Sequence, residues 1–144
     1  MSIAQIYACD FLSKNGNKWM LTRSLPFKTR YGTINVPEGF ETDLFSVVPD
    51  TRFPDFWKCA VLHDLLYFEI RHKNPHRMVK YKWQADLCFY DEMLIQSAII
   101  FGKLQDYVGT EMAVDEFQKL LKLSKLYYKG VSGVLGRLYQ WIAG

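Results

Sequence analysis

Two ionisable residues stand side by side in the most apolar stretch of the chain. His63 and Asp64 lie in CAVLHDLLYF, residues 59–68. On a helix His63 shares one face with Tyr67, whereas Asp64 is turned about 100° away. Burying a charge costs several kcal/mol unless the group is paired or bound to a metal. The pair therefore predicts either a functional site or a structural arrangement with a hydrogen-bonded histidine and an aspartate on the helix surface.

A second carboxylate lies further along the chain, at helical spacing from a tyrosine. Asp86 and Tyr90 occupy positions i and i+4 of WQADLCFYDEM. If the two helices are antiparallel neighbours, Asp86 can face His63, and a carboxylate on one imidazole nitrogen makes the other nitrogen a better base. Asp64 can then bind a hard cation such as calcium or magnesium through its carboxylate oxygens. Such a set can activate water to attack an ester whose carbonyl is polarised by the metal. On this reasoning His63 and Asp86 are the predicted catalytic pair, with Tyr67 and Tyr90 placed one turn from each of them.

The elements that must position these side chains fall into two parts. Short β-branched or aromatic runs, KWMLT and GTINV, alternate with turn-forming SKNGN and RYG in residues 1–50. From residue 54 onward apolar residues recur at helical spacing, which predicts helices over 56–70, 79–101 and 115–129 and a short one in GRLYQWIAG. We therefore predict one α+β domain, 1–144, in which a small N-terminal antiparallel β element precedes a helical bundle.

Composition narrows the class of protein. The 144 residues are 49% hydrophobic and 16% aromatic with a net charge of +3, which indicates a globular chain too weakly basic to argue for nucleic acid. The three cysteines favour reduced thiols in a cytosolic setting, and a Cys59–Cys88 disulfide stays open. The first residues lack the features of a signal peptide, and no apolar run reaches the roughly 18 residues of a membrane span. We expect no transmembrane segment.

The helical pair resembles phospholipase A2. HDLLY, residues 63–67, is similar to the HD-x-x-Y helix of the secreted enzymes, and ADLCFYDEM resembles the second catalytic helix of the smaller bacterial and fungal ones. This resemblance spans residues 59–93. It implies that His63 is the general base, that Asp86 orients it, that Asp64 is a Ca²⁺ ligand and that the two tyrosines are hydrogen-bonding supports. The implied substrate is a phospholipid or another envelope ester.

Three blocks of the sequence resemble a small domain of uncharacterised function known mainly from tailed bacteriophages and prophages. INVPEGFETDLFSVVP, AVLHDLLY and ADLCFYDEM follow, in order, its VP-x-GF-x-TD, HD-x-LY and R-x-x-AD-x-x-F motifs. The chain departs from the pattern at Phe45 and at Lys82-Trp83, near the usual arginine. The resemblance implies a phage origin and adds Asp43 as a second metal carboxylate, although Thr-Asp before Ser46 is equally good helix-capping chemistry.

Basic residues gather between the two helices, in RHKNPHR and KYK, with Tyr81 and Trp83 interleaved. Within this cluster His72 and His76 have the spacing of metal ligands. The basic cluster as a whole can contact phosphate head groups or nucleic acid. A solvated basic loop accounts for the same residues, so we expect no nucleic-acid partner. The aromatic C-terminal stretch predicts a core or partner-docking segment, with an interfacial helix as the alternative.

Three classes of function fit these features. The first, which we favour, is a phage protein of the virion or tail that is made in the host cytoplasm. It binds other phage structural proteins or itself and carries a phospholipase A2-like His-Asp site. The second is an active metal-dependent esterase, and the third is an intracellular effector that binds a host factor. An enzyme needs His63, Asp64 and Asp86 to converge on an open pocket, whereas a structural protein needs them sealed and its apolar patches covered by neighbours.

Overall fold

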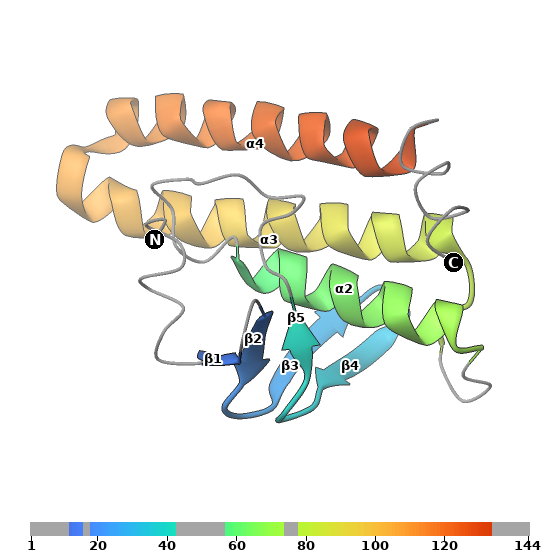
Figure 1. Ribbon diagram of the computed structural model, residues 1–144. Coiled ribbons are helices and arrows are strands. Elements are labelled where there is room, and N and C mark those ends of the chain that lie inside the picture. The colour runs from blue at the N-terminus through green and yellow to red at the C-terminus, as the bar shows by residue number, and fades with distance from the viewer. Residues whose placement is uncertain (1–11, 16–17, 43–56, 74–77, 134–144) are drawn as a thin grey trace.

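The computed structural model describes residues 12–15, 18–42, 57–73 and 78–133 and has the predicted α+β architecture (Figure 1). Short antiparallel strands come first and three helices follow. The strands are β1 (Leu12–Asn15), β2 (Lys18–Leu21), β3 (Leu25–Thr29), β4 (Gly32–Val36) and β5 (Glu41–Thr42). The helices are α2 (Trp57–Arg71), α3 (Lys82–Val108) and α4 (Thr110–Ser132).

The strands form two small sheets. One has the order β1-β2-β5 and the other is the β3-β4 hairpin, and every pairing is antiparallel. Buried and exposed side chains alternate along β2, β3 and β4, so that each strand turns one apolar face inward. The sequence pattern did not predict β3, which contains Pro26, a residue that cannot donate to a ladder. In a two-stranded sheet its nitrogen can lie on the open edge, and Pro26 pairs with Asn35.

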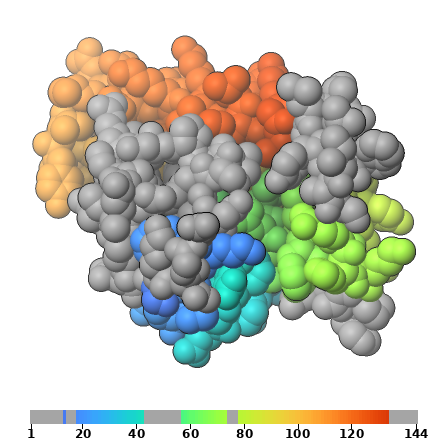
Figure 2. Space-filling model, viewed as in Figure 1, coloured from blue at the N-terminus to red at the C-terminus, as the bar shows by residue number. Residues whose placement is uncertain are grey.

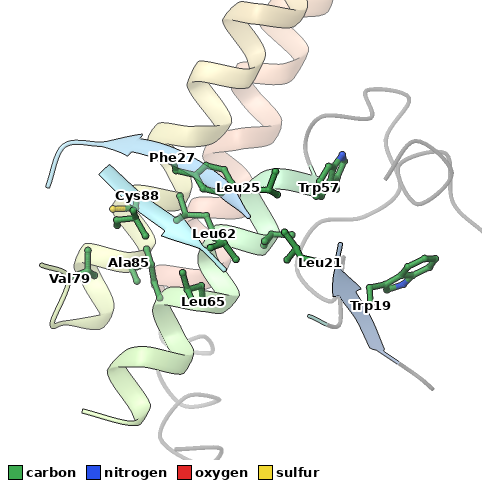
Figure 3. Packing of buried hydrophobic residues seen from close by; sticks show 14 residues of the cluster. Trp19, Leu21, Leu25, Phe27, Trp57, Leu62, Leu65, Val79, Ala85 and Cys88 are labelled. Atoms are coloured by element: carbon green, nitrogen blue, oxygen red, sulfur yellow. The ribbon is translucent and has the colours of Figure 1, made fainter. Parts of the chain in front are cut away.

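The helices stack on the strands in successive layers. Figure 1 shows α2 between the strands and the α3–α4 hairpin. The inner faces of the strands, one side of α2 and the first turns of α3 share one apolar core, in which Leu21, Phe27, Leu62 and Ala85 meet (Figure 3). A second core joins α3 to α4 through Phe89, Met93, Leu120 and Val131. The face of α2 that carries His63 is thus held between two apolar clusters.

Two helices have boundaries that differ from the predicted ones by several residues at both ends. The helix expected over 79–101 begins at Lys82 and continues to Val108. Val79 lies buried in the segment before it. Gly102 does not end it, since Phe101 packs on Phe117 of α4 at a ring distance of 5.0 Å. Gly109 follows the last residue of the helix, and its φ of +83° suits glycine. The next one, expected over 115–129, starts directly afterwards at Thr110.

Two further expectations can be compared with the structure. Cys59 and Cys88 are free and buried, so the disulfide that the sequence left open is absent from the structure. The short terminal helix expected in GRLYQWIAG lies outside the described residues. Among the residues that are described, no helix is long and apolar enough to cross a membrane.

Candidate functional site

His63 on α2 and Asp86 on α3 meet in the interior of the protein. The imidazole Nε2 lies 2.9 Å from the carboxylate Oδ1, and the two residues are 2% and 1% exposed. Because an ionised carboxylate only accepts hydrogen bonds, Nε2 carries the proton and Nδ1 is the basic nitrogen. The helical spacing that predicted this contact depended on α2 and α3 being neighbours, and they are.

Asp86 is held by three donors. Its Oδ1 also accepts a hydrogen bond from the Tyr67 hydroxyl, and its Oδ2 lies 2.6 Å from the Lys82 ammonium. The same ammonium donates to the backbone oxygen of Val131 at 2.5 Å, which connects the cluster to the end of α4. Burial alone raises the pKa of Asp86, but the hydrogen bonds from His63, Lys82 and Tyr67 outweigh it and hold that pKa below its ordinary value. The carboxylate is therefore ionised at neutral pH.

The His63 ring is enclosed by aromatic side chains. It stacks on Phe89 at a centroid distance of 4.6 Å and lies 4.0 Å from the Tyr67 ring. Burial lowers the pKa of His63, an effect that the hydrogen bond to Asp86 only partly offsets. The imidazole is therefore neutral at neutral pH and can in principle accept a proton. Its enclosure leaves almost none of it exposed to a substrate in this conformation.

Asp64 points to a different part of the molecule, as its helical position predicted. Its Oδ2 accepts a hydrogen bond from the Thr42 hydroxyl at the end of β5. Calcium takes roughly six to eight oxygen ligands, so these two side chains alone do not make a calcium site. Within the described ranges no group of three or more His, Cys, Asp or Glu side chains is placed to hold a metal ion. Asp43 lies outside the described residues, and calcium binding stays a prediction.

Tyr90 packs toward α4. Its half-buried ring packs on Tyr128 of α4 at 4.9 Å and joins the second apolar core. No contact among the described residues supports its predicted role beside Asp86. Tyr67 does make the predicted hydrogen bond to that carboxylate. The supporting tyrosines thus divide into one that touches the site and one that stabilises the α3–α4 hairpin.

Sequence reasoning missed three participants in these contacts. Lys82 had a readable signal, because it lies four residues before Asp86, a spacing at which opposite charges pair on a helix. It also holds the place of the arginine in the R-x-x-AD motif. Phe89 had the weaker signal of an apolar residue near Asp86 on the same helix. Thr42 belongs to the VP-x-GF-x-TD motif, but the motif does not indicate its contact with Asp64, which depends on how β5 meets α2.

Comparison with known proteins gives a single result. The model of a family described as a protein of unknown function (DUF1353) matches residues 19–107. This range includes the strands from β2 onward, α2 and nearly all of α3, and therefore His63, Asp64, Lys82 and Asp86. No curated protein and no solved structure matches the chain. The phospholipase A2-like character of the helix pair stays a prediction.

Proposed function

The chain belongs to the DUF1353 family of proteins of unknown function, and from this premise we propose that it is a bacteriophage structural protein of the virion or tail. On this proposal the His63–Asp86 cluster holds α2, α3 and α4 in register and does no chemistry. The observation that carries it is the enclosure of the cluster. His63 and Asp86 are buried, and the carboxylate is occupied by Lys82, Tyr67 and the imidazole.

Exposed apolar side chains on the α3–α4 hairpin form a surface that partner proteins could cover. Ile95 and Ile99 lie on successive turns of α3, and both are exposed. Tyr107 and Met112, near the turn into α4, are more exposed still. The end of α3 and the start of α4 form an outer edge of the molecule, drawn in orange in Figure 2. Neighbouring subunits of a particle are the partners that would cover such residues.

The test is the composition of purified particles. We expect mass spectrometry of density-purified phage to find the protein at a fixed copy number per particle. A phage carrying Ile99→Lys should give fewer complete particles, because the charge would have to be buried in the interface. Gln118→Lys adds the same charge at an exposed polar position of α4 and should leave the yield unchanged. Absence of the protein from purified particles would contradict the proposal.

A second candidate, a hydrolase, is favoured by one specific observation. The contact with Asp86 fixes the tautomer of His63, and the lowered pKa keeps its Nδ1 unprotonated at neutral pH, which are the properties of a general base. The aromatic enclosure of His63 would have to open before a substrate could reach the imidazole. Ester and phospholipid hydrolysis, measured with and without calcium, should then be lost in His63→Ala and kept in Asp91→Asn. Equal background rates in all three proteins would exclude this candidate.

A further inference from the structure

Two large aromatic side chains are exposed side by side at the start of α3. Tyr81 and Trp83 are 60% and 58% exposed. Their ring planes are nearly parallel, with an angle of 5° between them and 6.5 Å between their centroids. Neither ring contributes to the two apolar cores. The pair therefore presents flat, parallel ring surfaces to the solvent.

The backbone beneath these rings is fixed by several contacts. Val79 is buried in the first core, and Met78 packs closely against Gly32 in the β3–β4 hairpin. The Gln84 side-chain oxygen accepts hydrogen bonds from the backbone nitrogens of Lys80 at 2.9 Å and Tyr81 at 3.1 Å. The segment that carries the rings is thus ordered before any ligand arrives, which lowers the entropic cost of binding.

The surroundings of the rings are basic. The sequence from residue 70 to residue 85 contains no aspartate or glutamate. Arg71, Lys73 and Lys80 are exposed, and the end of α2 lies at the same end of the molecule as the start of α3 (Figure 1). Lys82 is engaged by Asp86, so the exposed cations are the ones that precede it in the chain. An anionic ligand is the one that this charge favours.

The sequence favoured a solvated basic loop with no nucleic-acid partner, but the exposure and parallel orientation of the two rings change that expectation. We propose that these five residues (Tyr81, Trp83, Lys80, Arg71 and Lys73), the Tyr81–Trp83 surface, bind single-stranded nucleic acid. Bases stack on the two rings and the cations contact phosphates, the combination by which proteins hold single strands without reading their sequence. The parallel orientation of the rings distinguishes this ligand from a lipid surface. Aromatic residues at a bilayer interface need no fixed orientation toward one another. Aromatic rings that stack on consecutive bases must be close to parallel. The interaction is independent of the His63–Asp86 cluster.

The test is a titration of a fluorescently labelled oligothymidylate of about 12 nucleotides, within the site sizes typical of single-strand binders. We expect anisotropy to show binding by the full chain at low salt that weakens steadily as salt is added. Trp83→Ala should weaken binding by roughly 5- to 150-fold, the range expected for the loss of one stacked base. Trp83→Phe retains a ring and should recover most of that loss.

The matched control is Tyr107→Ala. Tyr107 lies near the other end of α3 and is 86% exposed, so its substitution removes an exposed aromatic ring that is not part of the Tyr81–Trp83 surface. It should bind the oligonucleotide as tightly as the wild type. Equal weakening by Tyr107→Ala and Trp83→Ala would overturn the proposal, as would absence of binding at low salt. Phosphatidylglycerol vesicles are the second probe. Trp83-dependent binding to them without binding to the oligonucleotide would also overturn it and would indicate an anionic lipid surface.

Discussion

Substitution of Asp86 by asparagine should be among the most destabilising single changes in the protein. The new side chain keeps one acceptor oxygen but places an NH₂ group where Oδ2 receives the Lys82 ammonium at 2.6 Å. Removing one partner of a buried ion pair costs about 3–5 kcal/mol. The Lys82 side chain is 17% exposed, so solvent relieves part of the loss, and we expect the lower end, about 3 kcal/mol. That is a large part of the roughly 5–15 kcal/mol by which a domain is stable.

The assay is urea unfolding at neutral pH, followed by circular dichroism. Asp91→Asn is a matched control, because it makes the same change on the same helix and removes a carboxylate that binds Arg30 in two hydrogen bonds. That pair is exposed and screened by solvent, so its loss should lower the free energy of unfolding much less. Lys82→Met completes a double-mutant cycle. The double variant Lys82→Met/Asp86→Asn should be more stable than the sum of the single losses implies, because no unpaired ammonium remains.

Two outcomes would refute this reasoning. If Asp86→Asn cost no more free energy of unfolding than Asp91→Asn, the buried cluster would not hold the helices together. If the losses from Lys82→Met and Asp86→Asn were simply additive, the two side chains would not act as a pair in solution. Either result would also remove the basis for treating the cluster as a structural connection.

Four further predictions concern substitutions at single sites. Burial lowers the pKa of His63 below the ordinary value of about 6.5, so the unfolded chain binds more protons and stability falls as the pH drops below that value. His63→Gln should therefore reduce the drop in melting temperature between about pH 7.5 and pH 5.5, a window above the titration of Asp86. Gly32→Ala should cost about 1–3 kcal/mol in urea unfolding, because φ is +119° and the new Cβ would lie 2.7 Å from Met78 Sδ. Gly102→Ala, in open space within α3, should raise the free energy of unfolding by roughly 0.5–1 kcal/mol. A Gly32→Ala protein more stable than the Gly102→Ala protein would contradict the assigned backbone. Phe89→Ala should cost about 3–5 kcal/mol and expose the imidazole, which diethyl pyrocarbonate modification would detect; an unchanged modification rate would mean that Phe89 does not cover His63.

The sequence predicted the contacts that follow from helical periodicity. His63 and Tyr67 share a face of one helix, and Asp86 lies on the inward face of the next, so neighbouring helices bring them together. The same reasoning places Lys82 one turn before Asp86. It does not tell whether the resulting cluster opens to solvent, because that depends on Phe89 and on the packing of α4.

Other features depend on contacts between segments far apart in the chain. The hydrogen bond between Thr42 and Asp64 joins a two-residue strand to α2, and no local pattern announces it. The strand around Pro26 is stabilised by its partner β4 against its own low β propensity. Likewise Tyr90 has the spacing of a residue that supports Asp86, but its ring packs on Tyr128 of α4.

The second apolar core joins the segment that matches the family to a helix beyond it. The family match ends at residue 107, and α4 begins at Thr110, so the helix that covers Phe89 and Met93 lies beyond the shared segment. The burial of Phe89 and Met93 therefore depends on a helix outside the matched range, so a segment of residues 19–107 alone would expose that face of α3. The hydrogen bond from Lys82 to the backbone oxygen of Val131 joins the matched segment to the end of this helix.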